Sequence, residues 1–329
     1  MNAIVGNREV LARIPYLWKP LEKGYSDQSL YVNLDSLKAE VRSVDPGVKE
    51  LFVGGKGYGL RMLWDAVTPQ TKWSDPENEI VISGGPVCGI TQYAGAGKSI
   101  CVGLSPLTER VVDSNVGGHF GPHLKFAGFD ALELQGIASR EVIVYINGVD
   151  HEIEFFSPPE GMPVDSHLLA EELHAMFSDS ESDKLNVSVV STGQAAEHSL
   201  VGMLNFSFYD VKRKKIRLKQ AGRGGTGTVL RDKKIRALVV RSPRFTGKSN
   251  NPADFAKIAR AGLRIHREIH NLDDVQNRMR QVGTASLLTV MNDYDLLPVN
   301  NFKFGSHEDG KKISTEVFKK RFTQNMPDG

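Results

Sequence analysis

The sequence predicts an α+β protein, with a mostly antiparallel, sheet-rich domain up to about residue 244 and the start of an all-α domain after it. Val142–Gly148 and Glu152–Phe156 are apolar runs with Asn147-Gly148 in the turn between them, which is typical of a β-hairpin. This signal favours antiparallel sheets over alternating βαβ units. Beyond residue 252 apolar residues recur every three or four positions, which indicates helices.

The first part of the chain reads as short strands separated by turns. Residues 1–28 show no clear pattern and are interpreted as an N-terminal extension. Leu30–Leu34 is predicted as the first strand, and the spacing in Leu60–Trp64 suits a short helix. Ser74–Asn78 has the composition of a turn, and Ile80–Ile82 that of a buried strand.

After the hairpin a helix is expected from Asp165, whose carboxylate can cap it. Four apolar residues would share one face of this helix, namely Leu169, Leu173, Met176 and Phe177. Val187–Val190 and Ile235–Val240 then return to strand. Thr246–Pro252 is predicted to be a linker and helix start, with Pro252 in the first turn.

Two helices are expected after the linker, over residues 253–271 and Thr284–Met291. They have few companions to bury their apolar stripes, and Met326–Gly329 supplies no closing element, so the helical domain is expected to be truncated. The expected organisation is therefore an extension over residues 1–28, a domain over 29–245, and the start of a helical domain over 246–329.

The composition is that of an ordinary globular protein and argues against two classes of partner. Hydrophobic residues make up 40% and charged residues 24% of the 329 residues. A formal net charge of +2 does not point to nucleic acid or to a membrane surface. No apolar run is long enough to span a bilayer, and Met1–Glu9 lacks the apolar core of a signal peptide, so a cytoplasmic location is expected.

The two cysteines, Cys88 and Cys101, do not form a Cys-x-x-Cys pair. The chain therefore builds neither a zinc site nor an iron–sulfur cluster from its own cysteines. Both are expected to be small buried hydrophobic residues. His119 and His123 have the i, i+4 spacing of a helical metal site, but Pro122 intervenes and packing or surface roles are favoured.

Ser105–Leu132 is the most informative stretch, because a turn, a polar Asp-Ser-Asn, paired glycines and a helical pattern follow one another. Gly117 and Gly118 lack a Cβ, so the backbone there can approach a bulky ligand closely. They also lie where a helix is expected to begin, so free N–H groups would face an anion.

A second glycine-rich segment, Ala221–Gly227, offers similar chemistry with the Arg223 guanidinium added. Its G-x-G-x-x-G spacing is not expected to form a dinucleotide site, because Lys212–Lys219 is too basic for a buried parallel strand and Arg231–Lys234 interrupts the helix. The two segments indicate one large ligand that carries phosphate.

Ala96–Ser99 suggests a nucleotide-binding P-loop, but Gln92 stands where that motif needs glycine. A strand, Ile100–Val102, is also expected where the motif needs a helix. Nucleotide hydrolysis is therefore disfavoured. Lys98 remains a candidate contact to a phosphate or a pterin, and the alternative is a solvated lysine in a turn.

In combination these segments resemble the N-terminal part of the tungsten-containing aldehyde:ferredoxin oxidoreductases. The matching motifs are Ser74-x-Pro76-Glu77-Asn78, Gly85-Pro86, Ser105–Thr108, Ser114–Gly121, Leu124–Asp130, Ala221–Gly227 and Leu297–Phe302. Their order and spacing agree over roughly residues 28–305, and jointly they are specific although each alone is weak.

The resemblance implies a base domain of two β-sheets that carries a tungsten (or molybdenum) bis-pyranopterin, covered by helical domains that hold a [4Fe–4S] cluster. A magnesium ion would bridge the pterin phosphates, with Asn115 and the backbone carbonyl of Gln220 completing its shell. The remaining cofactor-binding positions that the resemblance implies are Lys98, Gly117, Lys219, Gly222 and Arg223.

This sequence departs from the family pattern at two cations and at the cluster. Lys98 and Lys219 stand where the family has arginine, and lysine loses the bidentate fork. The cluster cysteines would begin just after Gly329, so the chain is expected to be an N-terminal piece of a longer enzyme. A UGA codon meant for selenocysteine at the first cluster position is one specific cause.

The predicted function is therefore oxidation of an aldehyde to a carboxylate, with electrons leaving through an iron–sulfur cluster to ferredoxin or another iron–sulfur carrier. This chain would supply the pterin and magnesium platform, provide no catalytic residue, and be inactive without the rest of the enzyme or a cysteine-bearing subunit. A homo-oligomer is compatible with the sequence. Two alternatives stay open: a tungstopterin-dependent reductase of an aromatic acyl thioester, and a non-catalytic pterin-binding subunit.

Overall fold

The computed structural model describes residues 8–273, 279 and 282–325. The chain divides into two compact units, Met1–Ala259 and Arg260–Gly329. Met326–Gly329 and most of Met1–Glu9, for which expectations were stated above, lie outside the described residues. The domain boundaries expected from the sequence remain predictions.

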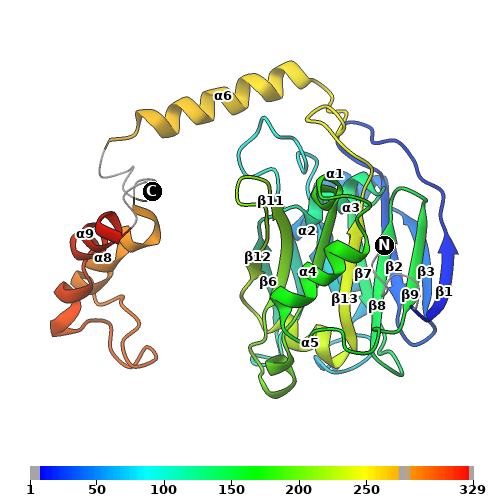
Figure 1. Ribbon diagram of the computed structural model, residues 1–329, viewed down its shortest axis with the longest axis horizontal. Coiled ribbons are helices and arrows are strands. Elements are labelled where there is room, and N and C mark those ends of the chain that lie inside the picture. Colours follow the sequence, from blue (N-terminus) through cyan, green and yellow to red (C-terminus); the bar gives the residue numbers. More distant parts are fainter. Residues whose placement is uncertain (1–7, 274–278, 280–281, 326–329) are drawn as a thin grey trace. The chain divides into compact units, whose positions relative to one another are not determined.

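The first unit is built on two β-sheets (Figure 1). In spatial order, the seven-stranded sheet consists of β1 (Val10–Pro15), β9 (Glu152–Phe156), β8 (Val142–Asn147), β13 (Ile235–Arg241), β10 (Val187–Ser191), β11 (Leu204–Asp210) and β12 (Lys215–Ala221). The six-stranded sheet consists of β3 (Lys38–Ser43), β2 (Gln28–Asn33), β7 (Ala131–Gln135), β4 (Ile80–Ser83), β5 (Ser99–Leu104) and β6 (Val111–Val116). The α+β class is confirmed, and among these described strands only β8–β13 and β2–β7 pair in parallel.

The two sheets approach each other at both edges, where β1 contacts β3 and β6 contacts β12. Two short helices, α3 (Phe120–Phe126) and α5 (Thr226–Asp232), each contact strands of both sheets. All seven residues of α3 are buried, because the helix has protein on every side. The main hydrophobic core therefore lies between the sheets and includes Phe120, Leu124 and Phe206.

The outer faces of the sheets are covered by further helices. Helix α4 (Ser166–Met176) packs on the seven-stranded sheet, and α1 (Pro46–Phe52) and α2 (Lys56–Ala66) accompany the six-stranded sheet (Figure 1). The expected cap is present, because Asp165 Oδ1 accepts the N–H groups of His167 and Leu168 at 2.9 and 3.0 Å. The expected face of α4 also packs as predicted, in a second core cluster.

The second unit is helical in its described part. Its elements are α6 (Phe255–Asn271), which crosses the boundary between the units, α8 (Leu288–Asp293), α9 (Thr315–Asn325) and the 3₁₀ turns Gly283–Leu287 and Glu308–Ile313. Two other 3₁₀ turns, Ser182–Asn186 and Gln194–His198, belong to the first unit. The helix expected over 284–291 is thus divided into a 3₁₀ turn and a short α-helix.

Three local predictions need correction. Strand β1 was missed within residues 1–28, because it is an edge strand that pairs only with β9, far away in sequence. Asn147 ends its strand, and its Oδ1 accepts N–H groups of Val149 and Asp150, so the hairpin turn is longer than two residues. Pro252 precedes α6, whose first turn is capped by Asp254 Oδ1 accepting the Lys257 N–H at 2.8 Å.

Candidate functional site

The site is built where the edge strands of the two sheets meet. The backbone N–H of Arg223, just after β12, donates to Ser114 Oγ on β6 at 3.1 Å. Gly224 packs so closely on β6 that an added Cβ would lie 2.6 Å from Val112 Cγ2. The second glycine-rich segment is therefore held directly against the strand that contains Asn115.

The loop that carries Lys98 reaches the same place from the neighbouring strand. Ser99 on β5 pairs with Val116 on β6, so Lys98, which precedes β5, and Gly117, which follows β6, lie at the same end of this strand pair. Gly97 lies against the paired glycines, since an added Cβ would be 2.6 Å from the carbonyl oxygen of Gly118. The P-loop reading is excluded here, because strand β5 follows Lys98.

Strand β12 contributes the remaining predicted residues. Lys219 pairs with Phe206 and Gln220 with Asn205, on the outermost strand of the seven-stranded sheet. The stem of Lys219 reaches towards β6, since its Cγ is 3.8 Å from where a Cβ on Gly118 would stand. Because β12 is an antiparallel edge strand with mostly exposed residues, it is no dinucleotide-binding parallel strand.

The structure thus brings all the predicted positions to one junction: Lys98, Asn115, Gly117, Lys219, Gln220, Gly222 and Arg223. A Cβ added to Gly117 or Gly222 would meet no atom within 4 Å, so both backbones face open space. The side chains of Lys98, Asn115, Lys219, Gln220 and Arg223 are exposed. Their roles in cofactor binding remain predictions.

The cations at this junction differ from other basic residues nearby. Arg213 and Arg217 are paired with Asp210 at 3.0 and 3.3 Å, and Lys56 is paired with Asp113 at 2.6 Å. In the described part of the chain, Lys98, Lys219 and Arg223 have no carboxylate within ion-pair distance. The junction therefore offers uncompensated positive charge next to open backbone, which is what phosphate binding requires.

A cavity of about 400 Å³ adjoins the junction behind the Lys98 loop. Its walls include Tyr93, Gly97, Gly118, His119 and Phe245. Burial lowers the pKa of His119, so its imidazole is neutral at neutral pH. His123 faces the protein interior, where its Nδ1 is 2.9 Å from Ser242 Oγ, which agrees with the expected packing role.

The sequence reasoning missed one residue that positions the site, Ser114. Its neighbour Asn115 is exposed while Ser114 is buried, as expected for successive residues of a strand. Ser114 Oγ then anchors the Arg223 backbone, which joins the two glycine-rich segments. The sequence offered one signal for Ser114: it directly precedes Asn115, so on a strand its side chain must lie on the face opposite to that of Asn115.

Three further findings concern metal binding and membrane insertion. Among the described residues no group of three His, Cys, Asp or Glu side chains is arranged to hold a metal ion. Cys88 and Cys101 are free and buried, as predicted. Within the same described part, no helix combines the length and the apolar character needed to cross a bilayer. The junction can thus bind an anionic ligand but holds no side-chain cluster for a transition metal.

Comparison with known proteins agrees with this geometry. Residues 29–242 match the model of the aldehyde ferredoxin oxidoreductase N-terminal domain, and residues 260–328 match that of aldehyde ferredoxin oxidoreductase domains 2 and 3. The chain is 29% identical over 308 residues to a tungsten-containing aldehyde ferredoxin oxidoreductase of Pyrococcus horikoshii, and 30% identical over 310 residues to that of Pyrococcus abyssi. Each alignment covers 92% of this chain and 47% of the relative, so the chain spans about half the length of these relatives.

A solved structure is also similar. It is a chain of the active site complex BamBC of benzoyl coenzyme A reductase in complex with 1,5-dienoyl-CoA, with a TM-score of 0.57 and 28% identity. The match covers 68% of this chain and 32% of that chain. The family match spans well over half of the sequence and includes both glycine-rich segments that meet at the junction. The chain belongs to the aldehyde ferredoxin oxidoreductase family.

Proposed function

We propose that this chain is the cofactor platform of a tungstopterin oxidoreductase. The observation that carries the proposal is the meeting of β6 and β12, which gathers three uncompensated cations and two open glycine positions at one place. The residues fit a ligand with phosphate groups, since Lys and Arg side chains bind phosphate and glycine lets backbone approach it. The tungsten-containing relatives support a pterin as that ligand.

Lys98, Lys219 and Arg223 would hold the phosphates, and the backbones of Gly117 and Gly222 would lie against the pterins. Asn115 and the Gln220 carbonyl are oxygen donors of the kind that magnesium prefers. A bound tungsten (or molybdenum) centre would supply the two-electron chemistry. The protein's contribution is then to bind and orient the cofactor, and neutral His119 in the adjoining cavity adds no positive charge there.

The activity that we propose for the whole protein is oxidation of an aldehyde to its carboxylate, with ferredoxin or a similar iron–sulfur carrier as acceptor. The names of the curated relatives support it. Because the sequence contains only Cys88 and Cys101, both buried, the [4Fe–4S] ligands must come from elsewhere. We therefore expect no aldehyde oxidation by the 329-residue chain alone.

Two other functions have specific support. The likeness to a chain of the benzoyl coenzyme A reductase complex favours reduction of an aromatic acyl thioester. A relative named aliphatic sulfonate oxidoreductase, WOR-like subunit, of Pyrococcus furiosus is 26% identical over 306 residues. It favours a chain that acts as a subunit beside a cysteine-bearing partner.

Cofactor loading tests the platform directly. The chain, expressed in a host that makes tungstopterin, should copurify with tungsten or molybdenum and with pterin, measured by metal analysis and by fluorescence of the oxidised pterin. The variant Arg223→Ala should lose most of both, and Arg213→Ala, on a cation already paired with Asp210, should not. Equal loading of the two variants would contradict the assignment, and aldehyde-dependent viologen reduction by the chain alone would refute the platform-only role.

A further inference from the structure

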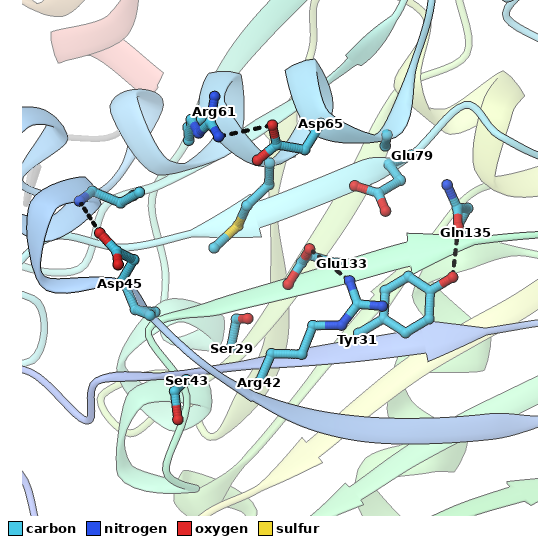
Figure 2. Close-up of a pocket in the computed structure, with 14 residues that line it drawn as sticks. Ser29, Tyr31, Arg42, Ser43, Asp45, Arg61, Asp65, Glu79, Glu133 and Gln135 are labelled. Atoms are coloured by element: carbon cyan, nitrogen blue, oxygen red, sulfur yellow. Dashed lines mark hydrogen bonds and ion pairs between the residues drawn. The ribbon is translucent and has the colours of Figure 1, made fainter.

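A second site lies at the opposite edge of the six-stranded sheet from β6. It is a cavity of about 580 Å³ on the outer face of β2, β3 and β7, beneath α1 and α2 (Figure 2). Its lining residues are Ser29, Tyr31, Arg42, Ser43, Val44, Asp45, Val48, Arg61, Met62, Asp65, Ala66, Glu79, Glu133 and Gln135. None of them belongs to the cofactor junction.

Two buried carboxylates dominate this cavity. Glu79 is 2% exposed and Glu133 is 5% exposed, and Figure 2 shows them pointing toward one another. Within the described structure, neither Glu79 Oε2 nor Glu133 Oε1 has a hydrogen-bond partner. A buried carboxylate oxygen without a partner is costly, and native proteins normally satisfy it. The two oxygens are therefore free to accept hydrogen bonds from a ligand in the cavity.

The cations that line the cavity are already engaged. Arg42 lies 3.6 Å from Glu133 and 3.2 Å from Glu40, with its guanidinium 3.5 Å from the centre of the Tyr31 ring. Arg61 pairs with Asp65 at 2.9 Å along α2. With Glu79, Glu133, Asp65 and Asp45 against these two arginines, the cavity carries excess negative charge when its carboxylates are ionised.

The shape of the cavity favours an organic cation over a metal ion. As noted, the described residues contain no metal-binding group of three, and this cavity is far larger than an ion. Val44, Val48, Met62 and Ala66 line it with apolar surface, against which an alkyl chain can pack. A volume of about 580 Å³ lies in the range of small-molecule pockets.

We propose that this cavity binds a small organic cation, an alkyl ammonium or alkyl guanidinium, with its charged head between Glu79 and Glu133 and its stem against Val48 and Met62. The head would donate hydrogen bonds to the two unpartnered oxygens. Such charge-assisted bonds are among the strong ones in proteins.

The titration of Glu79 agrees with this assignment. Burial, and then the Glu133 carboxylate, raises the pKa of Glu79 to about 8, although Arg42 and Lys233 oppose the rise and Asp65 adds to it. Burial also raises the pKa of Glu133, opposed by Ser29 and Arg42. At neutral pH Glu79 is thus protonated without a ligand, and a bound cation would favour its ionised form. Binding should release a proton and tighten as the pH rises through about 8.

Calorimetric titration of the full 329-residue chain tests the proposal. The probes are n-butylammonium, n-butylguanidinium and, as the uncharged counterpart, 1-butanol. We expect saturable one-to-one binding of at least one cation, no binding of 1-butanol, and release of close to one proton near pH 7, measured in two buffers of different ionisation enthalpy. Glu79→Gln should weaken binding at least tenfold, and Glu171→Gln, on an exposed residue of α4, should leave it unchanged.

The proposal is overturned by the absence of saturable cation binding, by equal affinity of Glu79→Gln and the parent chain, or by binding without proton release. Binding of MnCl₂ alone, with no binding of the organic probes, would overturn it in favour of a metal. Tighter binding of the peptide Gly-Lys-Gly than of n-butylammonium would overturn the small-molecule assignment in favour of a partner's lysine. The proton measurement uses only the parent chain, so it remains decisive if Glu79→Gln fails to fold.

Discussion

The two edges of the six-stranded sheet carry ionisable groups of opposite type, which are exposed at one edge and buried at the other. At the β6 edge, Lys98, Lys219 and Arg223 are exposed cations without carboxylate partners in the described chain. At the β3 and β2 edge, Glu79 and Glu133 are buried carboxylates that each have an unsatisfied oxygen. Exposed cations cost little to keep unpaired, whereas buried carboxylates are costly.

This difference shows how one sheet can offer two kinds of binding site. Glycines keep the first edge open, so a large anionic ligand can approach the backbone. At the second edge, helices α1 and α2 lie over the strands and leave a cavity of about 580 Å³, so a ligand there would be small. The comparison predicts that variants at the first edge change anion binding, and that variants at the second edge change the response to pH.

The largest expected effect is a loss of folding stability caused by overpacking in the second glycine-rich segment. An alanine at Gly227 would place its Cβ against the backbone carbonyl of Met203. Neither the Cβ nor this carbonyl can move away without a shift of the backbone. Gly227→Ala should therefore lower the free energy of unfolding by about 3 kcal/mol, measured by urea denaturation. Gly222→Ala is the matched control, since its Cβ meets no atom, and it should change stability by less than about 0.5 kcal/mol while reducing cofactor loading. Equal stability of the two variants would contradict this packing.

The next effect removes charge from the first edge without disturbing its fold. Arg223→Ala and Lys219→Ala should each weaken binding of inorganic pyrophosphate about tenfold to a hundredfold, because each removes a charge-assisted bond worth about 1.5–3 kcal/mol. Calorimetry at constant ionic strength measures the change. Arg217→Ala, on the same strand but paired with Asp210 at 3.3 Å, should have a much smaller effect. Three equal losses would show that the contribution is only net charge.

A smaller effect is expected at the second edge, in the pH dependence of stability that Glu79 causes. The pKa of Glu79 rises from 4.5 to about 8 on folding, so its contribution to stability is present below pH 4.5 and is lost as the pH rises through about 8. Relative to Glu79→Gln, the parent chain should lose about 1–2 kcal/mol between pH 5 and pH 8, less than the full shift implies because the cavity is open to water. Buried His123 and His174 have lowered pKa values and oppose this trend, but they affect both chains equally. Parallel stability curves would disprove the assignment.

The smallest effect concerns the exposed ion pair at the rim of the cavity. Arg61 and Asp65 are one helical turn apart on α2, at 2.9 Å, and both are well exposed. Asp65→Asn should therefore lower the free energy of unfolding by only about 0.3–0.5 kcal/mol, measured by denaturation at low salt. A loss above about 1 kcal/mol would mean that this pair, and not the buried carboxylates, dominates the electrostatics of the second edge.

Local patterns predicted much of the fold. The capped helix after Asp165, the hairpin strands and the strand Ile235–Val240 follow from rules that act within a few residues. Strand β1 was missed because it forms only by pairing with β9, which is distant in the sequence, so no pattern within residues 1–28 predicts it. The position of Pro252 was misjudged because Asp254 caps α6 instead.

The sequence by itself determined the glycine-rich segments, the cations beside them, the scarcity of cysteine and the family. Only the tertiary structure decided that these segments meet, because β6 and β12 are edge strands of different sheets and their contact depends on how the sheets pack. It also decided that Glu79 and Glu133 share one cavity, since their proximity depends on the pairing of β4 with β7. Local rules specify what each segment can do, and packing between distant segments decides which side chains act together.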